Sequence, residues 1–198
     1  MKKTLQNYNN YLSVIAESSK IKNQISNKQF YNKINNCIDH IYLSLKKGGK
    51  LMICGNGGSA ADAQHLAAEL LVRLNPNKNR KPIPAISLLQ DSSTFTACGN
   101  DYNFEEIFRR NFIALHKKND VLLVISTSGN SKNIIKVLKE AKSKKIKSIG
   151  FLGNNGGLAK KYCDFPLIIP SKKTARIQEM HIFMGHFIFD CVEKKLFY

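Results

Sequence analysis

The sequence predicts an α/β fold, with a parallel sheet covered by helices on both faces. Five short apolar runs recur after Lys50, and helical patterns separate most of them, which is typical of βαβ units. The chain of 198 residues has no internal repeat and no long linker, so we expect one domain with a helical extension. The predicted strands lie at 51–54, 85–89, 121–125, 148–152 and 166–169.

Two helical patterns precede the first strand. Apolar side chains recur at helical spacing over 4–19 and again over 34–45, where the pattern ends at Gly48 and Gly49. We therefore expect residues 1–49 to form a helical extension that contributes to an oligomer interface, and residues 50–198 to form the ligand-binding domain. Within that domain the predicted helices lie at 59–73, 104–117, 131–144 and 174–195.

Composition indicates an ordinary cytosolic protein. The formal net charge of +17 comes from lysines scattered along the chain, which favours solvated surface lysines over a nucleic-acid or membrane site. The five cysteines are widely separated and form no CxxC pair, as expected for reduced thiols. Residues 4–22 are too polar for a signal peptide, and the apolar stretch 182–192 is too short to span a bilayer.

A glycine-rich loop, Gly55-Asn56-Gly57-Gly58-Ser59, follows the first predicted strand and precedes a helix. Glycines let a ligand approach the backbone, and a helix N-terminus attracts anions or sugar hydroxyls. Ser59 is a good candidate for the helix N-cap. A tight turn without a ligand is the alternative.

Two nucleotide-binding motifs fit this loop poorly. Residues 55–60 match G-x-G-x-x-A, but the acidic residue expected about 20 positions later is missing from 75–80. A Walker A loop would need Gly-Lys-Ser/Thr, which does not follow. The polar stretch 75–81 is predicted to be an exposed loop.

A second loop, 126–131, reads Ser-Thr-Ser-Gly-Asn-Ser after the third predicted strand. Its hydroxyls are Ser126, Thr127, Ser128 and Ser131. Together with the amides of the following helix they can bind a phosphate without any cation. A capped Ser/Thr turn is the alternative, but four hydroxyls exceed what capping needs.

Two helices carry polar side chains suited to a metal ion. His65 and Glu69 lie four residues apart, within roughly 40° on one helix face, and could chelate one ion. On the last helix, Gln178 and His186 are about 12 Å apart along the axis. They could therefore share an ion only by leaning together or by coming from different subunits. His181 points elsewhere and is predicted to be a hydrogen-bonded residue of the core or of an interface.

These motifs resemble those of the phosphoheptose isomerases, which belong to the wider sugar isomerase (SIS) fold. The resemblance begins with Gly55–His65 and Ala67-Ala68-Glu69-Leu70 and covers roughly residues 30–195. It continues through 91–94, 99–102, 126–131, 174–179 and His186 in the same order.

The resemblance implies a three-layer α-β-α sandwich with a five-stranded parallel sheet, and a homotetramer whose active sites lie at subunit interfaces. It also implies one zinc ion per subunit, held by His65, Glu69, Gln178 and His186. The substrate contacts that it implies are Asn56, Gly57, Gly58, Glu69, Asn100, Asp101, Ser126, Thr127, Ser128, Ser131 and Gln178.

The activity implied is conversion of D-sedoheptulose 7-phosphate to D-glycero-D-manno-heptose 7-phosphate through an enediol, the first step toward heptose nucleotide precursors. Glu69 would be the base and His186 its acid/base partner. The main alternative is a non-catalytic SIS module that binds a phosphosugar or a protein. A dehydrogenase is disfavoured by the missing acidic residue.

Overall fold

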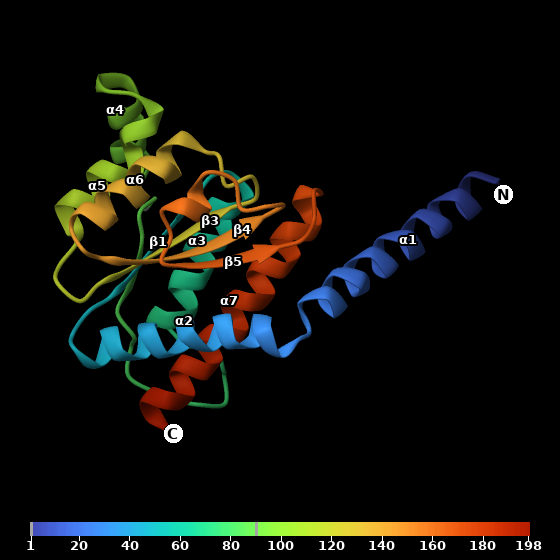
Figure 1. Cartoon of the computed structure of the whole chain (residues 1–198), viewed down its shortest axis with the longest axis horizontal. Coiled ribbons are helices and arrows are strands. Elements are labelled where there is room, and N and C mark those ends of the chain that lie inside the picture. Colours follow the sequence, from blue (N-terminus) through green and yellow to red (C-terminus); the bar gives the residue numbers. More distant parts are fainter. Residues whose placement is uncertain (1, 90) are drawn as a thin grey trace.

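The computed structural model describes residues 2–89 and 91–198 and contains one five-stranded sheet (Figure 1). All neighbouring strands are parallel, in the order β2-β1-β3-β4-β5. The strands are β1 (Leu51–Gly55), β2 (Ala85–Ser87), β3 (Val121–Ser126), β4 (Lys147–Gly153) and β5 (Phe165–Ile169). Each coincides with a predicted apolar run, so the α/β prediction is confirmed.

The helices agree with the predicted patterns, with one addition. They are α1 (Lys2–Ile25), α2 (Lys28–Lys46), α3 (Gly58–Leu71), α4 (Ser92–Asp101), α5 (Ile107–Leu115), α6 (Lys132–Ser143) and α7 (Thr174–Phe197). Short 3₁₀ turns are η1 (Phe104–Glu106) and η2 (Ala159–Lys161). Helix α4 was not predicted because it buries only Cys98 and so has no apolar periodicity.

Side chains alternate between the two faces of the sheet, which gives three layers. Leu51, Ile53 and Leu123 pack with α2, α3 and α7, while Met52 and Leu122 pack with α5 and α6. Figure 1 shows α5 and α6 on one side of the sheet and α2 and α7 on the other. Helix α2 buries its apolar face in the first of these clusters, so the core extends into the predicted extension.

Helix α1 projects away from the body of the molecule (Figure 1). Only its last turns are anchored, by the buried Ile21 and Ile25 and by a Glu17–Lys173 ion pair of 2.9 Å to the loop before α7. Met1, the first residue of the predicted extension, lies outside the described residues. Farther out, exposed apolar side chains cover about half of the helix circumference: Leu5, Tyr8, Tyr11, Leu12, Val14 and Ile15.

Many lysines gather where the helices end and the strands begin. A cleft of about 550 Å³ at this edge is lined by Lys47, Lys118, Lys144, Lys145 and Lys147. Lys47 and Lys144 are the C-caps of α2 and α6, whose terminal carbonyls form the negative ends of the helix dipoles. These lysines therefore complement the helix ends. Within residues 2–89 and 91–198, no helix has both the length and the apolar character needed to cross a bilayer.

Helices α3 and α7 pack closely and run in the same direction. Gly58 of α3 lies against the Gln178 side chain, and Gly185 of α7 lies against Leu66. A Cβ built at Gly185 would come within 2.5 Å of the Leu66 side chain, so no larger residue fits without a shift. The absence of a Cβ at Gly185 allows the two helices to approach at the level of His65 and His186.

The stretch 75–81, predicted to be an exposed loop, contains one buried side chain. The Arg80 side chain is only 1% exposed and pairs with Glu193 of α7 at 2.6 Å. That part of the prediction was wrong because a lone arginine in a polar stretch does not reveal a buried carboxylate 113 residues away.

His181 lies in the core, one of the two predicted places, but it lacks the predicted hydrogen bond to the described residues. It is fully buried, and among the described residues neither of its ring nitrogens has a hydrogen-bond partner. Burial lowers the pKa of His181 to about 4, an effect that the nearby Leu152 backbone opposes only in part. The folded protein therefore holds His181 neutral while the unfolded chain can protonate it near pH 6.5.

This shift predicts a loss of stability in mild acid. Below pH 6.5 the unfolded chain binds a proton at His181, whereas the folded protein binds it only near pH 4. The free energy of unfolding therefore falls as the pH falls from 6.5 to about 4. Between pH 7 and pH 5 this one group should cost about 2 kcal/mol of unfolding free energy. Urea titrations at both pH values should show the loss, and His181→Leu should lack it. An equal loss in the variant would contradict this origin.

Candidate active site

The two predicted ligand loops lie side by side at the carboxyl edge of the sheet. Strands β1 and β3 are neighbours, with Gly55 paired in register with Ile125, so the loops that follow them meet. The side-chain amides of Asn56 and Asn133 exchange two hydrogen bonds of 2.9 and 2.8 Å across the gap. The helices that follow β1 and β3 lie on opposite faces of the sheet. The carboxyl edge between two such strands is the usual ligand position in open α/β sheets.

The glycine loop turns sharply into α3. Gly57 has φ +56°, a left-handed conformation that favours glycine, and it is the N-cap residue. Ser59, predicted to be the cap, instead lies buried in the first turn, and its amide donates to the Asn56 carbonyl at 3.0 Å. That expectation was wrong by two residues. Gly57 and Gly58 remain exposed, so a ligand can reach their backbone.

The serine loop is shaped by its own hydroxyls. The Ser126 and Ser128 hydroxyl oxygens accept hydrogen bonds from the Gly129 and Asn130 amides, each at 3.1 Å. Within the described part of the chain, the Thr127 and Ser131 hydroxyls have no hydrogen-bond partner, although Ser131 is the N-cap of α6. Two hydroxyls therefore fix the turn, and two are left for a ligand.

His65, Glu69 and His186 come together in one chain. One ligand atom from each lies within 4.8 Å of the others. His65 Nε2 is 2.9 Å from His186 Nε2 and 3.3 Å from Glu69 Oε1. Ligands about 2.0–2.1 Å from a tetrahedral ion are about 3.3–3.4 Å apart, so the His65–Glu69 separation matches such an ion and the His65–His186 separation is shorter. Two imidazoles and a carboxylate are also ligands that zinc prefers.

Gln178 lies away from this group. Its side chain packs against Gly58, seven residues before His65 on α3. Because α3 and α7 run in parallel, Gln178 is about two helical turns from His186. Within one chain it therefore borders the glycine loop and not the histidines.

Asn100 and Asp101 lie at the end of α4, on the other side of the sheet. Both are exposed, and the Asn100 amide donates to Asp101 Oδ1 at 2.9 Å. Helix α4 packs against η1 and α5, on the face opposite α3 and α7 (Figure 1). The structure thus does not bring these two residues to the histidine and glutamate side chains of the same chain.

Two polar residues at the site were not predicted. Asn133, only 1% exposed, joins the two loops, and its position on the apolar face of α6 could have revealed it. Asp62 lies one turn before His65, and its Oδ2 is buried without a hydrogen-bond partner among the described residues. Burial raises the pKa of Asp62, and His65 partly opposes that shift.

Comparison with known proteins shows the family to which the chain is similar. The SIS domain family model matches residues 13–153. The phosphoheptose isomerase of Clostridium acetobutylicum is 49% identical over 169 residues, which is 85% of both chains.

Two solved structures are also similar. The phosphoheptose isomerase GmhA of Neisseria gonorrhoeae is 36% identical with a TM-score of 0.86, covering 94% of this chain and 98% of that one. The phosphoheptose isomerase of Francisella tularensis is 35% identical with a TM-score of 0.88, covering 96% and 98%. The chain therefore belongs to the phosphoheptose isomerase family of SIS-domain enzymes.

Proposed function

We propose that this isomerase converts D-sedoheptulose 7-phosphate to D-glycero-D-manno-heptose 7-phosphate, the first step toward heptose nucleotide precursors. The names of its relatives support a sugar-phosphate isomerase. The observation that carries the proposal is the meeting of His65, Glu69 and His186 on two helices that begin beside the ligand loops. Isomerisation needs a base near carbon and an acid near oxygen, and this group supplies both.

Zinc is the metal we propose for the group, one ion per subunit. His65, Glu69 and His186 would hold it, because one ligand atom from each lies within 4.8 Å of the others and zinc prefers these ligand types. When bound, zinc would polarise the carbonyl and hydroxyl oxygens of the sugar. Gln178 could be a fourth ligand only from a second subunit, and within its own chain it would contact the substrate near Gly58.

Proton transfer is assigned to two side chains. Glu69 would take the proton from C1 of the ketose and return it to C2. His186 would exchange protons with the oxygens at those carbons through Nδ1, because its Nε2 would hold the ion. A carboxylate held by a cation is a weak base, because the positive charge favours its ionised form. A bound ion would therefore lower the basicity of Glu69, the carboxylate that is assigned the role of base.

The phosphate would bind at the serine loop. Thr127 and Ser131 have hydroxyls with no bonds to other described residues, and the α6 N-terminus offers amides and a positive dipole end. Ser126 and Ser128 would donate their hydroxyl protons while accepting the loop amides. Asn56, Gly57 and Gly58 would bind sugar hydroxyls.

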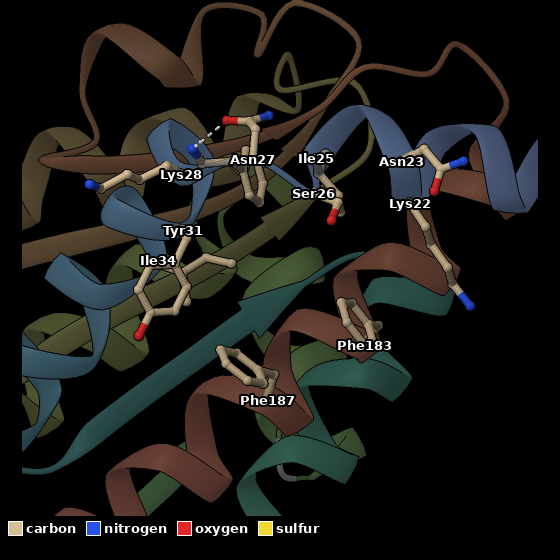
Figure 2. Close-up of a pocket in the computed structure, with 11 residues that line it drawn as sticks. Lys22, Asn23, Ile25, Ser26, Asn27, Lys28, Tyr31, Ile34, Phe183 and Phe187 are labelled. Carbon is tan, nitrogen blue, oxygen red and sulfur yellow. Dashed lines mark hydrogen bonds between the residues drawn. The ribbon is translucent and has the colours of Figure 1, made fainter.

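We further propose that the enzyme is a homotetramer whose sites are completed across subunits. Asn100 and Asp101 would then serve the site of another subunit, since they lie on the opposite face of the sheet in their own chain. A groove of about 500 Å³ lies beside α7, where Phe183 and Phe187 are 47% and 38% exposed (Figure 2). This groove and the exposed apolar half of α1 together form an apolar surface that a second copy of the chain would bury.

A cytosolic location is proposed from the five separated cysteines, which suit a reducing compartment. The alternative function, a non-catalytic SIS module that binds a phosphosugar or a protein, would use the two loops but would have no need for Glu69 and His186 together. Turnover of sedoheptulose 7-phosphate, followed by formation of the aldose phosphate, separates the two. Binding without turnover would favour the regulator.

Glu69→Gln should lower kcat at least 100-fold, because the amide has no basic oxygen to accept the proton. The aldose product is the measured quantity, and circular dichroism should report an unchanged fold. Glu140→Gln is the matched control, since it changes a remote carboxylate that pairs with Arg109. Activity of Glu69→Gln close to that of the control would remove Glu69 from the mechanism.

Metal removal should lower both activity and melting temperature. Zinc at 100 times its dissociation constant should restore about 2.7 kcal/mol of stability, since it binds only the folded chain. Thermal unfolding in zinc, with magnesium as the comparison, would measure this effect. His65→Ala should abolish the zinc response. A zinc response that persists in His65→Ala would place the ion elsewhere.

Leu12→Glu should dissociate the oligomer by placing a charge on the apolar face of α1. Leu12 is 44% exposed in the single chain, so the substitution should leave the subunit folded. Sedimentation velocity gives the mass of each species. Gln6→Glu, on the polar face of the same helix, should leave the tetramer intact. Equal masses for the two variants would exclude this face from the interface.

A further inference from the structure

Arg80 connects the two helices that carry the candidate metal ligands. Its Nε donates to Glu193 Oε2 of α7 at 2.6 Å. Its Nη2 donates to the Glu69 carbonyl and its Nη1 to the Leu70 carbonyl, each at 2.8 Å. Weaker Nη1 bonds reach the Val72 carbonyl at 3.3 Å and the Lys81 carbonyl at 3.1 Å.

Two of these bonds satisfy backbone carbonyls at the C-terminal end of α3. The last carbonyls of a helix have no partners within it, and a guanidinium that reaches several of them holds the end in one position. Glu69 is the residue that matters here, because its carbonyl accepts from Arg80 while its carboxylate belongs to the metal-ligand group. The ligand is thus fixed through its own backbone.

The same arginine fixes α7. Glu193 follows His186 by seven residues, or about two turns, so the two side chains share one side of that helix. The side chains of Arg80 and Glu193 are 1% and 3% exposed, so the pair is shielded from solvent. A buried ion pair is costly to break on one side only, since the remaining charge stays in the interior.

We propose that Arg80 is a positioning residue, which sets the spacing between the α3 ligands His65 and Glu69 and the α7 ligand His186. This inference rests on the proposed metal site. The Gly58–Gln178 contact joins α3 and α7 at their other end. The ligand group therefore lies between this contact and the Arg80–Glu193 pair. Residues that orient metal ligands typically change metal affinity 10- to 100-fold when removed.

The test separates positioning from stability. Arg80→Lys keeps a charge for Glu193 but cannot reach both helix carbonyls at once. A double variant, Arg80→Met with Glu193→Leu, removes both charges, so it should regain the part of the stability that Arg80→Met alone loses through the unpaired Glu193 carboxylate. Lys50→Met is the control, because it breaks a Lys50–Asp120 pair of 2.5 Å at the start of β1, where Lys50 bonds to neither α3 nor α7.

Co²⁺ serves as the probe, with its visible absorption giving the dissociation constant and urea unfolding giving stability. We expect Arg80→Lys and the double variant to bind Co²⁺ 10- to 100-fold more weakly and to lose kcat in step. Lys50→Met should lose stability while keeping its Co²⁺ affinity.

Unchanged Co²⁺ affinity in Arg80→Lys, or an affinity that recovers together with stability in the double variant, would overturn the role of Arg80 and leave the proposed function standing. Failure of the unaltered protein both to bind Co²⁺ and to isomerise the substrate would overturn both.

Discussion

The close parallel packing of α3 on α7 is the contact on which the candidate site depends. Gly58 and Gly185 allow it, since a side chain at either position would meet Gln178 or Leu66. Beside the second of these contacts the helices place His65 next to His186, with Nε2 atoms 2.9 Å apart. Neither helix could bind an ion well alone, so the chemistry of the site is a property of the pair. Arg80 and Glu193 strengthen the pair from one end.

The sheet performs a different task, which is to place the ligand loops. Neighbouring strands β1 and β3 deliver the glycine and serine loops to the same edge, and the Asn56–Asn133 amide pair holds them together. In the proposed function, backbone and hydroxyl groups of these loops would hold a sugar phosphate while the metal-ligand group would act on its carbonyl end. The lysines at the opposite edge complement helix ends and are remote from this chemistry.

Local pattern predicted the sheet and most helices because buried strands and amphipathic helices have apolar periodicity. It predicted His65 with Glu69 because both lie on one helix. It could not predict the partner of Arg80 or the amide pair of Asn133, because those contacts join residues that are distant in sequence. Helix α4 was missed because it has little contact with the core. Spacing along α7 left open how Gln178 and His186 could share an ion, and parallel packing places them at different levels of α3.

The most direct test of this account is anomalous X-ray diffraction at the zinc edge from crystals of the zinc-loaded protein. The account predicts one anomalous peak per subunit, about 2.0–2.2 Å from His65 Nε2, His186 Nε2 and a Glu69 carboxylate oxygen of the same chain. A peak elsewhere, or one that draws His65 and His186 from different subunits, would contradict it.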